Sequence, residues 1–369
     1  MTIAINCRLN NAEQPEGYAG LLFGILDQLT AKFHEHAFIF IFDKPYPADI
    51  FFAKNVTPII TGPETRSTLR LQYWLNYKIP AVLRKHKATV FVSLEGTCSM
   101  RTKIPQCLVM AGCSFMQPRL MQNPQARFYK KHSAGFLAKA KSIATFSTYA
   151  RELIAGQYKM PESAITVLNP AVDNIFQPME WDEKEHIKEK YTEGRAYFIY
   201  SGDINQHSNT ISLLKAFTFF KTRQKSNMRL LIAGNAPVSF KKELSTYKFR
   251  NDVLLLEGLP LAELAKITAA AYALVHPVLY SDLAIGPLQA MRCGIPMIVA
   301  NTGALPAICG QAAIYCNTDI KSIAESMMLV FKDEDEAARL VREGNDLLQQ
   351  YTYARSAGLL MQCILQCAD

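Results

Sequence analysis

HPVLYSDLAIGPLQAMRCGIPMIVAN, residues 276–301, is the stretch of this sequence that decides the fold. An apolar run at 271–275 predicts a buried strand just before it, and 295–300 predicts the next strand. Between them, Gly286-Pro287 predicts the start of a short helix with proline at its first position, and Gly294 predicts the end of that helix. A strand, loop and helix in this order place backbone N–H groups and the positive helix end where an anion binds.

Outward from this stretch, short apolar strands alternate with helical segments along the whole chain. Strands are predicted at 2–7, 37–42, 56–60, 89–93, 106–110, 142–146 and 165–168, and then at 197–200, 229–233, 253–256, 271–275, 297–300 and 312–316. A helix is predicted at 18–33. This alternation is typical of parallel sheets covered by helices. We therefore predict an α/β fold with two doubly wound, Rossmann-like domains that face a cleft, and ligands at the carboxyl ends of the strands.

The acidic, polar segment 177–194 interrupts the alternation, which restarts at 197. It predicts the connection between the domains together with a first helix. The chain has 369 residues, 49% of them apolar, which suits two ordinary cores. No apolar run reaches the roughly 18 residues that span a bilayer, and residues 1–10 predict a strand rather than a signal peptide. We therefore expect a cytoplasmic protein.

The nine cysteines form no C-x-x-C pair and mostly lie within apolar segments. Reduced thiols in the core explain them better than disulfides or zinc, so we predict no metal site.

Positive charge is concentrated in the first half of the chain. Residues 1–175 carry 20 Lys and Arg against 11 Asp and Glu, whereas 176–369 carry 20 against 21. The basic region 65–151 contains fifteen bases, one acid (Glu95) and interleaved aromatic residues. This pattern fits a surface for an anionic membrane or a lipid-linked glycan, and equally an ordinary solvated basic face. No recognition motif points to nucleic acid.

The quoted stretch also resembles the donor-binding motif of family-4 retaining glycosyltransferases with the GT-B fold. That motif runs proline, small residue, two residues, Glu, Gly, Phe, Gly, four residues, a second Glu, Ala, and then Gly-x-Pro. Further family-like segments follow in order at 35–63, 101–105, 138–147, 168–178, 197–217, 230–234 and 304–315. The resemblance covers nearly the whole chain. It implies an acceptor-side domain at 1–175, a donor-side domain at 176–351, and a closing helix at 352–369 that packs back on the first domain.

In the family, a nucleotide diphosphate-sugar binds the second domain, after a Ser-Gly turn that falls here at Ser201-Gly202. The basic pair that holds the diphosphate falls at His207 and Ser208, so only a protonated histidine supplies a cation there. Backbone N–H groups near Gly202 and Gly286 remain available to a phosphate.

The carboxylates of the family motif are also replaced. Its first Glu falls at Ser281, beside Asp282, and its second at Gln289, whose amide still forms hydrogen bonds. Asn209 is predicted to be a helix N-cap rather than a ligand contact. We predict that His276 packs at a strand end.

On the first domain, the resemblance places a His-Asp pair at Ala111-Gly112. The Gly-x-Gly turn near the start begins at Gly17 and ends with alanine. On the second domain, the Glu that usually follows Leu-Pro in the family falls at Ala307. Each replacement removes a charged or catalytic group while the apolar frame around it is kept.

These replacements predict a glycosyltransferase-family protein of bacterial glycan assembly that is catalytically impaired or silent. It would act as a partner subunit of an active glycosyltransferase, bind UDP- or GDP-sugars weakly, use no other cofactor, and lie in the cytoplasm or at the inner face of the membrane. Two alternatives remain. One is an active transferase with a rebuilt site that uses Asp203, Asp282, His207 or Lys215. The other is a non-enzymatic membrane-surface or carbohydrate-binding module.

Overall fold

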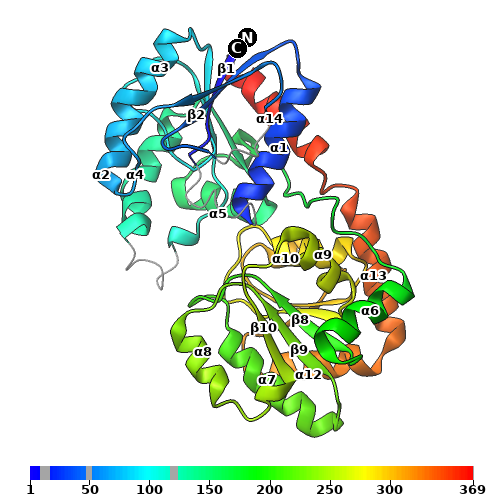
Figure 1. Cartoon of the computed structure of the whole chain (residues 1–369). Helices are drawn as coiled ribbons and strands as arrows, with labels where there is room; N and C mark the ends of the chain where they lie inside the picture. Colours follow the sequence, from blue (N-terminus) through cyan, green and yellow to red (C-terminus); the bar gives the residue numbers. More distant parts are fainter. Residues whose placement is uncertain (9–16, 47–51, 117–123, 369) are drawn as a thin grey trace. The chain divides into compact units, whose positions relative to one another are not determined.

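The computed structural model describes residues 1–8, 17–46, 52–116 and 124–368. Parts of four segments used above therefore lie outside the described residues: the end of 1–10, positions 47–51 of 35–63, Arg119 of the basic region, and Asp369 of the predicted closing helix 352–369. The chain divides into two compact units, one made of Met1–Ala171 with Thr352–Asp369 and one made of Val172–Tyr351. Each unit is built on one parallel sheet, as Figure 1 shows.

The first sheet has the strand order β3-β2-β1-β4-β5-β6-β7. Its strands are β1 Thr2–Asn6, β2 Ala37–Phe42, β3 Val56–Ile60, β4 Val90–Ser93, β5 Gln106–Val109, β6 Ser142–Thr145 and β7 Ile165–Val167. Its helices are α1 Tyr18–Lys32, α2 Thr68–Tyr73, α3 Ile79–Lys85, α4 Pro124–Lys139, α5 Thr148–Tyr158 and α14 Tyr353–Ala368, with the π-turn Trp74–Lys78 joining α2 to α3. Helices α1 and α14 lie side by side, and α2 to α4 lie on the other side of the sheet (Figure 1).

The second sheet has the strand order β10-β9-β8-β11-β12-β13. Its strands are β8 Tyr197–Ser201, β9 Arg229–Ala233, β10 Val253–Leu256, β11 Ala273–His276, β12 Met297–Ala300 and β13 Ile314–Cys316. Its helices are α6 Trp181–Thr192, α7 Thr210–Gln224, α8 Val238–Ser245, α9 Leu261–Ala269, α10 Ile285–Arg292, α11 Leu305–Cys309, α12 Ile320–Lys332 and α13 Glu334–Leu348. The strand order reverses between β8 and β11, which is the point of an open sheet where ligands bind.

The predicted α/β fold of two Rossmann-like sheets is confirmed, because every predicted strand is present and all strand pairs are parallel. The start of α10 is wrong by two residues. The helix begins at Ile285, and Pro287 is its third residue rather than its first. The reason is that Ala284 adopts the left-handed conformation, with φ at 52°, and turns the chain into the helix earlier. Gly294 ends the helix as predicted, with φ at 67°.

Helix α14 belongs to the first unit although it follows the whole of the second in sequence. Gly24 of α1 receives the ring of Tyr353, and a Cβ on Gly24 would lie 2.4 Å from Cε1 of that ring. The Ser356 hydroxyl donates to the Asn169 carbonyl at 2.9 Å, and the Cys363 and Cys107 sulfurs are 3.6 Å apart. All nine cysteines are buried free thiols.

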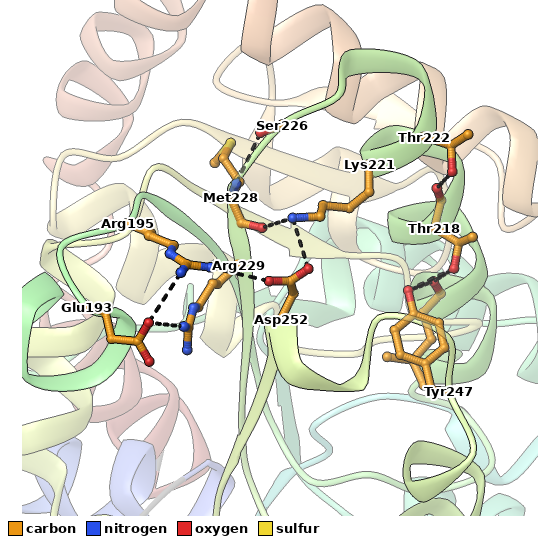
Figure 2. A network of polar contacts seen from close by, with 11 residues as sticks. Glu193, Arg195, Thr218, Lys221, Thr222, Ser226, Met228, Arg229, Tyr247 and Asp252 are labelled. Atoms are coloured by element: carbon orange, nitrogen blue, oxygen red, sulfur yellow. Dashed lines mark hydrogen bonds and ion pairs between the residues drawn. The ribbon is translucent and has the colours of Figure 1, made fainter.

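A network of polar contacts ties together the amino ends of β8, β9 and β10 (Figure 2). Buried Lys221 places its Nζ 3.0 Å from Asp252 Oδ2 and 3.1 Å from the Met228 carbonyl. Glu193 accepts from Arg229 at 2.6 Å and from Arg195 at 3.3 Å. Because ligands bind at the carboxyl ends of such strands, this network fixes the opposite edge of the sheet and leaves the ligand edge free.

Candidate functional site

The carboxyl ends of β8 and β11 meet at the switch point of the second sheet. Ser201 ends β8, and Gly202 follows it with φ at 137° and its N–H donating to the Ala233 carbonyl at 2.9 Å. Gly234, with φ at 151°, follows β9, and a Cβ there would lie 2.2 Å from the Gly202 oxygen. Two glycine turns therefore pack backbone against backbone at this edge, and neither a side chain nor a methyl group fits between them.

The start of α10 closes the same edge. A Cβ on Gly286 would lie 3.2 Å from the Ser201 oxygen and 3.5 Å from Nδ1 of His276. The first turn of the helix is thus next to the end of β8. We call Ser201, Gly202, His276 and Gly286 the switch-point edge. It has the strand, turn and helix start that the sequence predicted for an anion.

The two positions that correspond to the family's basic pair lie in a turn that closes on itself. Ser208 is 2% exposed, and its hydroxyl donates to the Asn205 carbonyl at 2.8 Å. The His207 N–H donates to Asn205 Oδ1 at 2.8 Å, and the His207 carbonyl accepts from the Leu279 N–H at 2.8 Å. The Ser208 side chain therefore hydrogen-bonds within its own turn and presents no charge to a ligand.

Asn209 is the N-cap residue of α7 by position, with φ at 54°, but its side chain makes no capping hydrogen bond. Its Nδ2 instead donates to the carbonyls of Pro277 and Thr318, each at 2.9 Å. The predicted N-cap position is therefore confirmed, although the side chain makes no capping hydrogen bond. Asn209 joins the loops after β11 and β13, and its amide hydrogens are both occupied.

Ser281, at the position of the family's first carboxylate, is also bonded within its own loop, and the two aspartates that the rebuilt-site alternative requires have hydrogen-bond partners as well. The Ser281 hydroxyl accepts from the Ala284 N–H at 3.2 Å, just before α10. Asp282 accepts from the Tyr280 hydroxyl at 2.9 Å, and Asp203 accepts from the Asn235 backbone N–H at 3.1 Å. Gln289 is buried on α10, and Lys215, which the rebuilt-site alternative requires, lies exposed on α7.

His276 differs from the prediction of a satisfied packing residue. Its ring stacks on that of Tyr200, with centroids 5.7 Å apart and planes at 14°, but its buried Nδ1 has no hydrogen-bond partner among the described residues. Burial lowers the pKa of His276 to about 4. The imidazole is therefore neutral near pH 7 and adds no cation to the switch-point edge.

The remaining predicted positions are spread over both units. Ala111 and Gly112 follow β5 in the first unit, and Gly17, with φ at 76°, precedes α1. The Tyr18 hydroxyl donates to the Leu94 carbonyl, so this side chain is held within its own unit. Ala307 lies exposed on α11 of the second unit.

Sequence reasoning missed a buried polar network at the carboxyl ends of β1, β2 and β4. Arg8 Nε and Nη2 each lie 2.7 Å from Glu95 Oε2, and Arg8 Nη1 donates to the Thr65 hydroxyl at 3.0 Å. Thr65 in turn donates to Asp43 from its backbone N–H at 2.8 Å and its hydroxyl at 2.6 Å. Burial raises the pKa of Glu95 to about 7, although Arg8 beside it acts in the opposite direction.

The sequence contains one signal that could have predicted this network. Glu95 is the only acid of the basic region 65–151, and it stands just after a predicted strand. Perturbed carboxyl groups gather at functional sites, so the network is a candidate polar site of the first unit. In the part of the chain that the structure describes, no group of three or more His, Cys, Asp or Glu could hold a metal ion.

The second unit of this chain is similar in sequence to known glycosyltransferases. Residues 182–346 match the family described as glycosyl transferases group 1. The chain is 23% identical over 237 residues to O-antigen chain mannosyltransferase B of Escherichia coli, a match that spans 60% of this chain and only 59% of that relative.

Two solved structures share the fold over almost their full length. Sucrose-phosphate synthase from Thermosynechococcus elongatus has a TM-score of 0.80 at 14% identity and covers 98% of each chain. Anabaena Alr3699/HepE in complex with UDP-glucose has a TM-score of 0.75 at 10% identity, again over 98% of each chain. The family match, the curated relative and the shared fold agree: residues 182–346 are similar to the group 1 glycosyltransferases, and the chain has two Rossmann-like sheets of the GT-B kind.

Proposed function

We propose that this chain is a glycosyltransferase-family protein of bacterial surface-glycan assembly whose own transfer activity is strongly impaired, and that it works as the partner subunit of an active transferase. One observation carries the proposal. The side chains at the positions of the diphosphate cation and the sugar-facing carboxylate, Ser208 and Ser281, hydrogen-bond within their own turns. The O-antigen mannosyltransferase among the relatives supports surface glycan as the process.

A diphosphate at the switch-point edge would meet the backbone N–H groups of the first turn of α10, near Gly286, and His207 nearby, whereas the Gly202 N–H already donates to the Ala233 carbonyl. It would meet no lysine or arginine from position 208. The charge that grows on a leaving diphosphate is then poorly opposed. Removing one such electrostatic contact costs about 10²–10³ in rate, and several contacts are missing here. Weak binding of a UDP- or GDP-sugar therefore accompanies very slow transfer. The neighbouring fold that binds UDP-glucose supports this class of ligand.

The first test is turnover. The purified protein, incubated with UDP- and GDP-sugars including GDP-mannose, is expected to release no nucleotide diphosphate above the rate of a protein-free control. Mass spectrometry of the acceptor mixture and a coupled diphosphate assay measure this. Robust turnover would contradict the impaired-site proposal and favour the rebuilt site, in which Asp203, Asp282, His207 or Lys215 takes a new role.

The second test is the pH dependence of ligand binding. Affinity for UDP is expected to increase severalfold as pH falls from about 7.5 to 5.5, because histidine gains its positive charge in this range and His207 is the only titratable residue of the 205–210 turn. Calorimetric titration at both pH values measures the change. His276 does not titrate in this window, since its pKa is about 4.

Two matched variants distinguish the contribution of His207 to the pH response from that of His276. His207→Gln should bind UDP equally at both pH values, whereas His276→Gln should keep the pH response of the unchanged protein. If the response persists in His207→Gln, another group supplies the charge and this assignment is wrong.

A second candidate function concerns the basic region 65–151. We propose that it contacts an anionic membrane or a lipid-linked glycan and so holds the protein at the inner face of the membrane. Its single acid, Glu95, is paired with Arg8 inside the first unit and is not available to the bases of the region. Arg66 and Arg151 have carboxylate partners, Glu64 and Glu162. Among the described helices none is both long and apolar enough to cross a bilayer.

A further inference from the structure

A pocket of about 470 Å³ opens on the first unit between the helical run 68–85 and the residues that lead into β5. Its lining includes three basic side chains, Arg84, Arg101 and Lys103, and three further groups, Tyr77, Asn76 and Thr102. The Arg101 guanidinium lies over the Tyr77 ring, 4.2 Å from its centroid. A cation–π contact of this kind holds an arginine in place and leaves its N–H donors available to an anion.

The charge of this pocket has no counter-ion in the described part of the chain. None of Arg84, Arg101 and Lys103 forms an ion pair there, and Glu95, the nearest acid in sequence, is occupied by Arg8. Three like charges around one cavity repel each other unless an anion enters. A phosphate group suits the set, since arginine donates to two phosphate oxygens at once and lysine adds a point charge.

An exposed apolar stripe adjoins the pocket. Leu69, Tyr73 and Tyr77 stand four residues apart on the continuous run of α2, the π-turn and α3, and are 77%, 46% and 48% exposed. The Tyr73 and Tyr77 rings stack with centroids 5.3 Å apart. Met100, 48% exposed, is fixed beside them because its N–H donates to Asn76 Oδ1 at 2.8 Å. Apolar and aromatic side chains next to clustered bases are typical of a surface that lies in a lipid headgroup layer.

We propose that this pocket binds the phosphate of an anionic lipid headgroup, while Leu69, Tyr73 and Met100 enter the boundary between headgroups and acyl chains. The inference rests on the proposed membrane contact of the basic region and narrows it to one cavity. Residues 101–104 lead into the amino end of β5, whereas the network of Arg8 and Glu95 lies at the carboxyl ends of the same sheet. Lipid binding therefore leaves that ligand edge of the sheet open.

The test compares two triple variants with the same loss of charge. The pocket variant is Arg84→Gln, Arg101→Gln and Lys103→Gln. The control is Lys85→Gln, Lys131→Gln and Lys141→Gln, which are exposed bases of the same region outside the pocket lining. Sedimentation with vesicles of phosphatidylcholine and phosphatidylglycerol is expected to show at least a tenfold weaker partition for the pocket variant than for the control, since each base near an anionic surface contributes about 1 kcal/mol.

A second pair of measurements distinguishes a lipid headgroup from free inorganic phosphate as the ligand of the pocket. Tyr73→Ser with Leu69→Ser should weaken vesicle binding severalfold and leave the weak calorimetric binding of inorganic phosphate unchanged. Binding of inorganic phosphate without binding to anionic vesicles would overturn the lipid assignment.

Two other outcomes are decisive. An equal loss in both triple variants would overturn the pocket and leave the general basic face in place. If the unchanged protein does not bind anionic vesicles at low salt, both the proposed membrane contact and the proposed lipid-headgroup site are wrong. Thermal unfolding of each variant should match the unchanged protein, because the altered side chains are exposed or half-exposed.

Discussion

Replacing Arg8 with methionine is expected to lower the free energy of unfolding by about 3–5 kcal/mol, because it leaves the buried carboxylates of Glu95 and Asp43 without their cation. Both partners are tied to this guanidinium, Glu95 directly at 2.7 Å and Asp43 through the Thr65 hydroxyl. Urea unfolding followed by fluorescence measures the loss. Trp74 is buried in the first unit and reports on it, whereas Trp181 is exposed in the second.

The pH dependence of that loss identifies its cause. The pKa of Glu95 is raised from 4.5 to about 7 in the folded chain, so the folded state binds this proton more tightly than the unfolded state. Its contribution to stability is therefore fully present below pH 4.5 and is lost as pH rises through 7. Arg8 matters most where Glu95 is ionised, so Arg8→Met should lose more stability at pH 8 than at pH 5.

Two control variants accompany this prediction. Arg70→Met, at an exposed position of α2, should change stability by less than about 0.5 kcal/mol. Arg8→Met combined with Glu95→Leu should recover part of the loss, because the unpaired charge is removed with its partner. The same loss in the single and double variants at both pH values would show that packing, not charge, is what Arg8 supplies.

Gly234→Ala is the second large change that we expect, with a loss of about 3–5 kcal/mol. The φ of 151° is strained for an L residue, and the new methyl group would lie 2.2 Å from the Gly202 carbonyl oxygen, a backbone atom that has no rotamer to change. The turn after β8 must then move away from the turn after β9, which opens the switch-point edge. Calorimetric unfolding and UDP binding should both detect it.

Gly258→Ala is the matched control. Its φ is 62°, and a Cβ there meets no atom within 4 Å, so only the conformational cost of about 1 kcal/mol remains. A loss at Gly234 no greater than that at Gly258 would mean that the two glycine turns are not packed as closely as described here.

Local patterns of sequence account for the elements of this fold but not for their long-range contacts. Strand cores such as Phe38 to Phe42 are apolar on consecutive positions, and that signal is visible in any short window. The early start of α10 was missed because Ala284 adopts a conformation that glycine usually occupies.

The site was harder to predict, for a related reason. Asn209 binds a carbonyl 109 residues further along the chain, and Arg8 binds an acid 87 residues away. No window of sequence contains both partners of such a pair. The sequence motif shows which charged residues are missing from the switch-point edge. Only the structure shows that the side chains that replace them, Ser208 and Ser281, form hydrogen bonds within their own turns.

The notch at Gly24 that receives Tyr353 has a consequence for how this chain is made. The ribosome delivers α1 and the seven strands of the first sheet early, yet the helix that covers them comes after the entire second unit. During synthesis the second unit therefore has all its residues while the first still shows an open seam along α1. Tyr353 closes that seam, so the first unit, although it is synthesised first, can complete its packing only after the second unit has been synthesised.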